Sequence, residues 1–151
     1  MRFKQLRELL NYVATCRVEM AKLYSRLQTD ADSTRVKMML VYFQQHQLGV
    51  SDKLNKYIDL ASTNVLGTWY KDIIFEDFIK KCRDTVLTAK MSEEDILALH
   101  LNLDNRLINL LQETAEHSSS LDIAETLHEL VRVEKIQQQR LVHSSIRMDD
   151  L

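Results

Sequence analysis

The chain has 151 residues and a net charge of −2, and its composition of two glycines and no proline is poor in turn-forming residues. Sheet proteins need many such residues, so this composition argues against an all-β fold. The 20 basic residues are interspersed with 22 acidic ones, which argues against nucleic acid or an anionic membrane as a partner. No apolar run approaches the roughly 18 residues of a membrane span. Two cysteines without a secretory signal predict a reduced, cytoplasmic protein.

The first predicted helix covers about residues 2–28. Its apolar residues recur every three or four positions, which is the spacing of one helix face. They are Leu9, Val13, Cys16, Met20, Leu23 and Leu27. A short polar turn follows, in which Asp32 or Ser33 is a good N-cap for the next helix. The sequence therefore predicts a helical hairpin at the start of the chain.

The second predicted helix covers about residues 34–61, and His46 lies on its apolar face, three residues after Phe43. The other members of this face are Met39, Val50, Leu54 and Tyr57. Gly49 inside this helix costs about 1 kcal/mol relative to alanine. Either a close helix contact or a local kink would explain this glycine.

The connection to the second half of the chain begins where residues 62–68 break the helical pattern. Residues 69–90 are predicted to form an extra, shorter helix that covers one end or side of the bundle. Its apolar positions are Trp69, Ile73, Ile74, Phe78, Ile79, Cys82 and Val86.

The second predicted hairpin starts at Ser92, an N-cap followed by three acidic residues, which the helix dipole favours in the first turn. The third long helix runs to about Glu116. A polar turn leads to a fourth helix over about residues 121–142, and residues 143–151 are predicted to be a polar, frayed tail. We thus expect one helical-bundle domain over residues 1–142.

Four long helices in two hairpins, joined by one long crossover, predict an all-α antiparallel four-helix bundle. Residues equally far from the turn of a hairpin lie at the same height. Counting from the two turns pairs Glu19 with the segment from Phe43 to His46. The same count pairs Asp104 with the segment from Glu134 to Gln137. All of these residues lie on or beside the apolar stripes.

On these residues the chain resembles the ferritin-like superfamily of the rubrerythrin and bacterioferritin kind. That fold holds two metal ions with one Glu from each of two helices and a Glu-x-x-His motif from each of the other two. The resemblance implies that Glu19 and Glu134 match family ligands, that Asp104 is a shortened one, and that His46 retains an imidazole. Two ligand positions are replaced, by Phe43 and by Gln137.

Three states of this site follow from the resemblance. The polar residues form a metal-free core in which they satisfy one another, with Phe43 filling the metal volume. Alternatively Glu19, His46, Asp104 and Glu134 hold a single Fe, Mn or Zn ion. A working di-metal centre is the third state.

The missing ligands favour a non-enzymatic bundle that acts through protein binding or self-association, as a homodimer or with another protein. They leave open the alternative of a single-metal oxidase or metal-binding stress protein. A small-molecule site around Phe43 and His46 is a further class. Glu125 and His128 form a literal Glu-x-x-His, but they lie off the apolar stripe and are expected on a solvated face.

Overall fold

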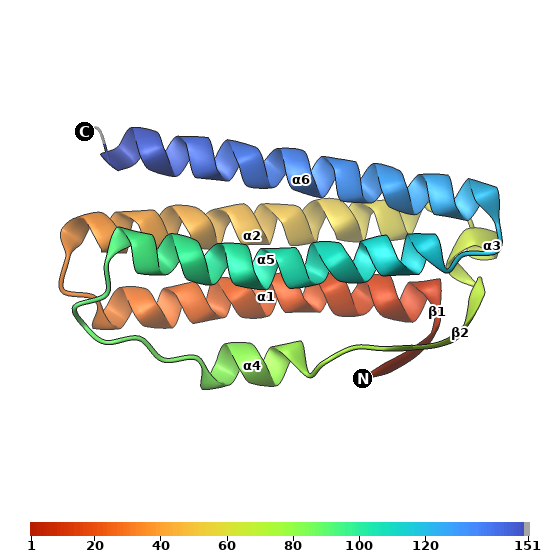
Figure 1. Ribbon diagram of the computed structural model, residues 1–151, viewed down its shortest axis with the longest axis horizontal. Coiled ribbons are helices and arrows are strands. Elements are labelled where there is room, and N and C mark those ends of the chain that lie inside the picture. Colours follow the sequence, from red (N-terminus) through yellow and green to blue (C-terminus); the bar gives the residue numbers. More distant parts are fainter. Residues whose placement is uncertain (150–151) are drawn as a thin grey trace.

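Four long antiparallel helices form the body of the computed structural model, which describes residues 1–149 (Figure 1). They are α1 (Leu6–Asp30), α2 (Thr34–Leu60), α5 (Glu93–Glu116) and α6 (Leu121–Asp149). A short turn joins α1 to α2, and another joins α5 to α6, so each pair is a hairpin of neighbouring helices. This arrangement confirms the predicted bundle of two hairpins with one long crossover.

Side-chain caps fix where two of the long helices begin. The Ser33 side chain accepts a hydrogen bond from the backbone N–H of Val36 at 3.3 Å, which starts α2. At the start of α5, the Ser92 hydroxyl accepts from the N–H of Asp95 at 3.0 Å, and the Asp95 carboxylate accepts from the N–H of Ser92 at 2.9 Å. This reciprocal capping box satisfies backbone donors that a helix end leaves without a partner.

The crossover contains a short helix within residues 69–90, as predicted, but this helix covers far less of the range. In chain order, the crossover contains a one-turn helix, α3 (Thr63–Leu66), a strand, β2 (Trp69–Ile74), and this short helix, α4 (Phe78–Asp84). β2 pairs with an antiparallel strand at the N-terminus, β1 (Arg2–Gln5), where the first helix was predicted to begin. Aromatic and β-branched residues dominate β2 and favour strands, so pairing with β1 overrides their helical spacing. The all-α prediction therefore needs this two-stranded ribbon added.

The polar tail predicted from residue 143 is also wrong as far as the structure describes it, because α6 continues to Asp149. Leu141 and Ser145 are both buried, and their four-residue spacing carries the inward stripe of α6 onward. No proline or glycine follows to end the helix. Residues 150 and 151 lie outside the described part of the chain.

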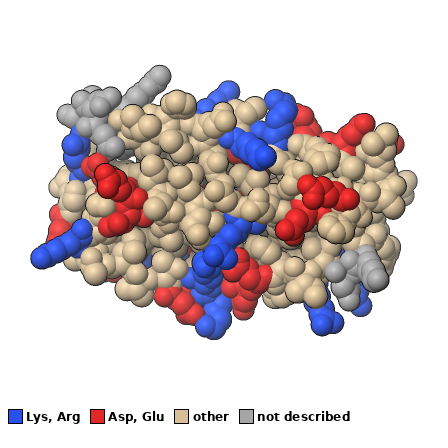
Figure 2. All heavy atoms as spheres, viewed as in Figure 1, with Lys and Arg blue, Asp and Glu red and all other residues tan. Residues whose placement is uncertain are grey.

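One continuous core lies between the long helices, and the apolar stripe predicted for α1 is buried throughout. On α2, Phe43 is fully buried and His46 is half-buried. The surface in Figure 2 carries acidic and basic side chains interspersed over the visible face. Among residues 1–149, no helix has the length and apolar character needed to cross a bilayer.

Gly49 lies on the exposed side of α2, and a Cβ atom built there would find nothing within 4 Å. A close contact inside the described chain therefore does not explain this glycine.

Candidate functional site

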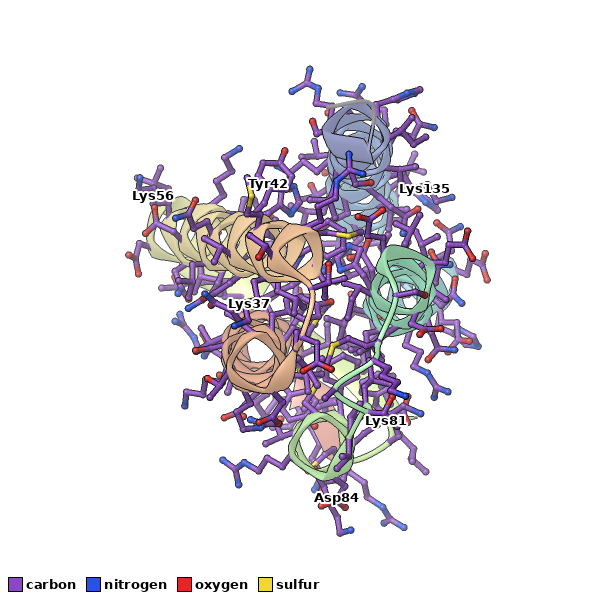
Figure 3. The ribbon with its side chains drawn as sticks, turned by 90° about the vertical axis from the view of Figure 1, so that its left-hand side faces the viewer. Lys37, Tyr42, Lys56, Lys81, Asp84 and Lys135 are labelled. Carbon is purple, nitrogen blue, oxygen red and sulfur yellow. The ribbon has the colours of Figure 1, made fainter. Side chains whose placement is uncertain are left out.

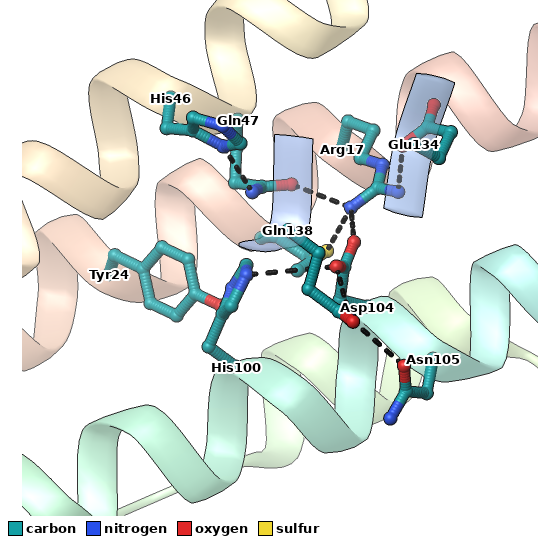
Figure 4. A network of polar contacts seen from close by, with 10 residues as sticks. Arg17, Tyr24, His46, Gln47, His100, Asp104, Asn105, Glu134 and Gln138 are labelled. Atoms are coloured by element: carbon teal, nitrogen blue, oxygen red, sulfur yellow. Dashed lines mark hydrogen bonds and ion pairs between the residues drawn. The ribbon is translucent and has the colours of Figure 1, made fainter. Parts of the chain in front are cut away.

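A fully buried arginine, Arg17, lies at the centre of the bundle (Figure 4). One of its terminal guanidinium nitrogens, Nη1, donates hydrogen bonds to Oδ1 of Asp104 and, at 2.9 Å, to Oε1 of Gln47. The other, Nη2, donates to Oε2 of Glu134 at 2.6 Å. These four residues come from α1, α5, α2 and α6 in turn. The Arg17 network, as we call these four side chains, therefore draws one residue from each long helix.

Arg17 and Asp104 hold each other ionised against the cost of burial. Burial lowers the pKa of Arg17, but Glu134 and Asp104 outweigh it and raise that pKa above its usual value. Burial raises the pKa of Asp104, but the Arg17 guanidinium more than compensates, so the net shift is downward. For Glu134 burial dominates, and its pKa is raised despite the same guanidinium. Asp104 is thus the more firmly ionised partner of Arg17.

Asp104 is held from both of its oxygens. Oδ1 accepts from Arg17, and Oδ2 accepts from the side-chain amide of Gln138 on α6 at 2.7 Å. The same Gln138 amide donates to Asn105 at 2.9 Å. The carboxylate that the resemblance assigns to a metal ion is therefore used in binding protein groups.

A second polar pair, Tyr24 and His100, borders the Arg17 network. Burial is the main cause that lowers the pKa of His100 to about 4 and raises the pKa of Tyr24. Both groups are therefore neutral at pH 7, and the Tyr24 hydroxyl shares a hydrogen bond of 2.7 Å with Nδ1 of His100, in which the tautomer of the imidazole sets the donor. The remaining nitrogen, Nε2, lies 3.9 Å from Oδ2 of Asp104. The ring of Phe43 packs on both, with centroids 5.9 Å from Tyr24 and 5.0 Å from His100.

The structure separates the residues predicted as metal ligands. Asp104 and Glu134 come together, but on either side of Arg17. Glu19 is buried elsewhere, where its carboxylate accepts from Lys22 at 3.4 Å and from Arg83, in the last turn of α4, at 3.3 Å. His46 lies at the edge of the core, and its Nδ1 is 3.3 Å from the amide of Gln47.

The remaining predicted positions are those that the resemblance treats as replaced ligands. Phe43 is fully buried, and its ring lies 5.0 Å from the ring of His100. Gln137 is half-exposed and lines a groove between α2 and α6. The exposed Glu125 and His128 lie on the solvated face of α6, as predicted.

Arg17 was not among the predicted site residues, although its position on α1 carries a signal. Arg17 follows Val13 by four residues and precedes Met20 by three, and both neighbours are buried. A basic residue on the buried line of a helix demands an acidic partner. His100 and Asp104, four apart on α5, and Glu134 and Gln138, four apart on α6, supply the same kind of signal.

These residues do not fit a metal ion while Arg17 is in place. Within the described part of the chain, no three side chains of His, Cys, Asp and Glu come together in a way that could hold one. A divalent cation bound to Asp104 and Glu134 would lie within about 4 Å of the guanidinium. At that distance the repulsion is about 8 kcal/mol for an effective dielectric constant near 20. Two ions would be repelled more strongly still.

Comparison with solved structures supports the fold. The chain is similar to a protein from Thermotoga maritima whose crystal structure is assigned to a ferritin-like diiron-carboxylate protein. The TM-score is 0.60, the sequences are 14% identical, and the similarity covers 95% of each chain. No protein-family model and no curated protein sequence matches the chain. The chain therefore has a ferritin-like fold, as the sequence predicts.

Proposed function

We propose that this protein is a non-enzymatic ferritin-like bundle whose central cation is the guanidinium of Arg17, and that it acts by binding protein. The observation that carries the proposal is the placement of Arg17 between Asp104 and Glu134. A positive charge on a buried side chain balances carboxylates that a metal ion would balance in a diiron-carboxylate protein. In this proposal the buried carboxylates need no bound cofactor to balance their charge.

The reactive side chains near the core support a role without covalent chemistry. Burial is the largest cause that raises the pKa of each thiol, Cys16 and Cys82, to about 12. A thiol with that pKa is not a nucleophile at neutral pH. His100 is neutral and hydrogen-bonded to Tyr24. What remains for function is the outer surface of the helices.

The rival proposal is a single-metal oxidase or metal-binding stress protein. It is favoured by the similarity to a diiron-carboxylate protein and by the presence of two carboxylates at the bundle centre. For Fe, Mn or Zn to bind there, Arg17 must leave the carboxylates, and Glu19 must turn away from Arg83 to join them.

Metal analysis separates the two proposals. The protein is purified without chelator, its metal content is measured by elemental mass spectrometry, and its thermal unfolding is followed with and without Fe(II), Mn(II) or Zn(II). A native-state ligand at 100 times its Kd would add about 2.7 kcal/mol of stability. We expect no stoichiometric metal and no such gain in stability. Stoichiometric metal, or a gain of this size, would favour the rival proposal.

An Arg17→Met variant supplies the matched control. It removes the positive charge and leaves the carboxylates of Asp104 and Glu134 facing each other. If Arg17 is what excludes cations, divalent ions should stabilise this variant and not the wild-type chain. Equal responses in both chains would contradict the role given to Arg17.

A further inference from the structure

The outer face formed by α2 and α6 has an open, partly apolar groove along it. One stretch of the groove has a volume of about 530 Å³ and is lined by Tyr57 on α2 and by Leu130 and Val133 on α6. A second stretch, of about 170 Å³, continues from the same Leu130 and Val133 to Val50 and Leu54. Seen along the bundle, Tyr42 and Lys56 lie on the side of α2 away from α1 (Figure 3). We call this surface the α2/α6 face.

Two features of the α2/α6 face are unfavourable in a single copy of the chain. Gly49 lies on the exposed side of α2, where a glycine weakens the helix and nothing in the described chain approaches it. Large apolar side chains are also exposed here. Met38 at 58% and Leu60 at 88% lie eleven residues before and after Gly49, three helical turns away on the same line of α2, and Val133 on α6 is exposed at 38%. A helix packed from outside against Gly49 would account for both.

The charges on the two walls of the groove are opposite. Asp122, Glu125 and Glu129 form the acidic wall on α6. Lys56 is exposed on the α2 wall and directly precedes Tyr57, which lines the same stretch of the groove as these acids. Lys53, also exposed, lies about one helical turn further along and lines the second stretch with Val133. Two of these charges already form pairs within their own helix, Lys56 with Asp52 at 3.1 Å and Glu129 with Arg132 at 2.5 Å, but exposed pairs of this kind contribute little.

From this pattern we propose that the α2/α6 face binds a second copy of the chain about a two-fold axis that runs along the groove. Such an axis places α6 of one copy over α2 of the other and leaves the position of every residue along the bundle unchanged. The acidic wall of each copy then meets the lysines of its partner, and α6 crosses the exposed surface at Gly49. The inference rests on the proposed function, because it names the protein partner.

The size of the α2/α6 face is adequate for a stable dimer. A helix of 27 residues, such as α2, is about 40 Å long, and two adjacent helices are about 20 Å wide. The resulting face has about 800 Å² for each partner, which is the size of a standard specific interface.

A charge exchange tests the proposal by light scattering and sedimentation of the purified full chain. Lys53→Glu with Lys56→Glu makes both walls acidic, and Glu125→Lys with Glu129→Lys makes both walls basic. We expect wild type to be dimeric and each of these two variants to be monomeric. Mixing the two variants should restore a dimer, because each acidic wall then meets a basic one. A mixture that stays monomeric, or variants that dimerise like wild type, overturns the proposed face.

Gly49→Trp gives an independent test with Asn109→Trp, on the exposed side of α5, as its control. We expect Gly49→Trp to weaken the dimer about tenfold or more, a change of about 1.4 kcal/mol. Asn109→Trp should leave it unchanged. Circular dichroism at a concentration where both are monomeric verifies that each still folds.

Failure of the proposed face and failure of the proposed function are distinguishable. A wild-type chain that is metal-free yet monomeric up to its solubility limit overturns the dimer alone. A chain that carries stoichiometric metal overturns the proposed function whatever its oligomeric state.

Discussion

Replacing Arg17 by Met should lower the free energy of unfolding, because it removes the positive charge that pairs with two buried carboxylates. Methionine fills much of the same volume but carries no charge, so Asp104 and Glu134 become two buried carboxylates without a counter-ion. Removing one partner of a buried ion pair costs about 3–5 kcal/mol. That loss is a large fraction of the roughly 5–15 kcal/mol that stabilises a typical domain.

The pH dependence of the loss identifies its cause. Without Arg17, burial and mutual repulsion raise the pKa of both carboxyls above their unfolded values. A group whose pKa is raised on folding contributes stability below its unfolded pKa and loses it as pH rises through the folded pKa. The Arg17→Met chain should therefore be closest to wild type in acid and fall further behind as pH rises toward 7.

Urea unfolding between about pH 4 and pH 7.5 measures this difference, with fluorescence of the one tryptophan and circular dichroism as probes. Adding Asp104→Asn and Glu134→Gln to Arg17→Met removes the stranded charges and should recover much of the stability and flatten the pH dependence. Arg132→Met, which breaks an exposed pair with Glu129, is the control and should cost about 0–1 kcal/mol. A loss that is independent of pH, or no recovery in the triple variant, would refute the reasoning.

Three further predictions concern single residues. Because the pKa of His100 falls to about 4 on folding, its contribution to stability is present above pH 6.5 and is lost as pH falls toward 4. His100→Gln should therefore reduce the loss of stability between pH 6.5 and 4 by a value on the order of 3 kcal/mol, measured by urea unfolding. The exposed His128→Gln is the control, and equal pH profiles for the two variants would contradict the prediction. Ser92→Ala should cost about 1 kcal/mol in urea unfolding, because the capping box with Asp95 is lost, and no change would argue against that cap. Phe43→Ala should lower the free energy of unfolding by about 3–5 kcal/mol, and a loss below 1 kcal/mol would mean that the core collapses into the space.

The long helices could be predicted because their signals are local. Ser33 and Ser92 mark helix starts through caps that depend only on residues three positions away. The ribbon could not be predicted in the same way. Trp69 and Ile73 fit a helical spacing, and only the pairing of Phe3 with Ile73 across the chain selects the strand. No local pattern reports a partner that lies about 70 residues away.

The candidate site was predicted at the right height but with the wrong orientation on one hairpin. Distance from the turn fixes how far along the bundle a residue lies, and Asp104 and Glu134 do meet. It does not fix the direction in which the side chain points. On α1, Arg17 points to the centre, while Glu19, two residues later and about 200° around the helix, points toward Arg83.

The contribution of one residue from each long helix to the Arg17 network has a consequence for assembly. Arg17 and Gln47 belong to the first hairpin, and Asp104 and Glu134 to the second. Apolar stripes alone would let two hairpins dock in several registers or with opposite handedness. Any such misdocked arrangement would trap an unpaired charge in the core, at a cost of several kcal/mol. We infer that the buried ion pairs select one way of joining the hairpins, so that a polar centre makes the topology unique.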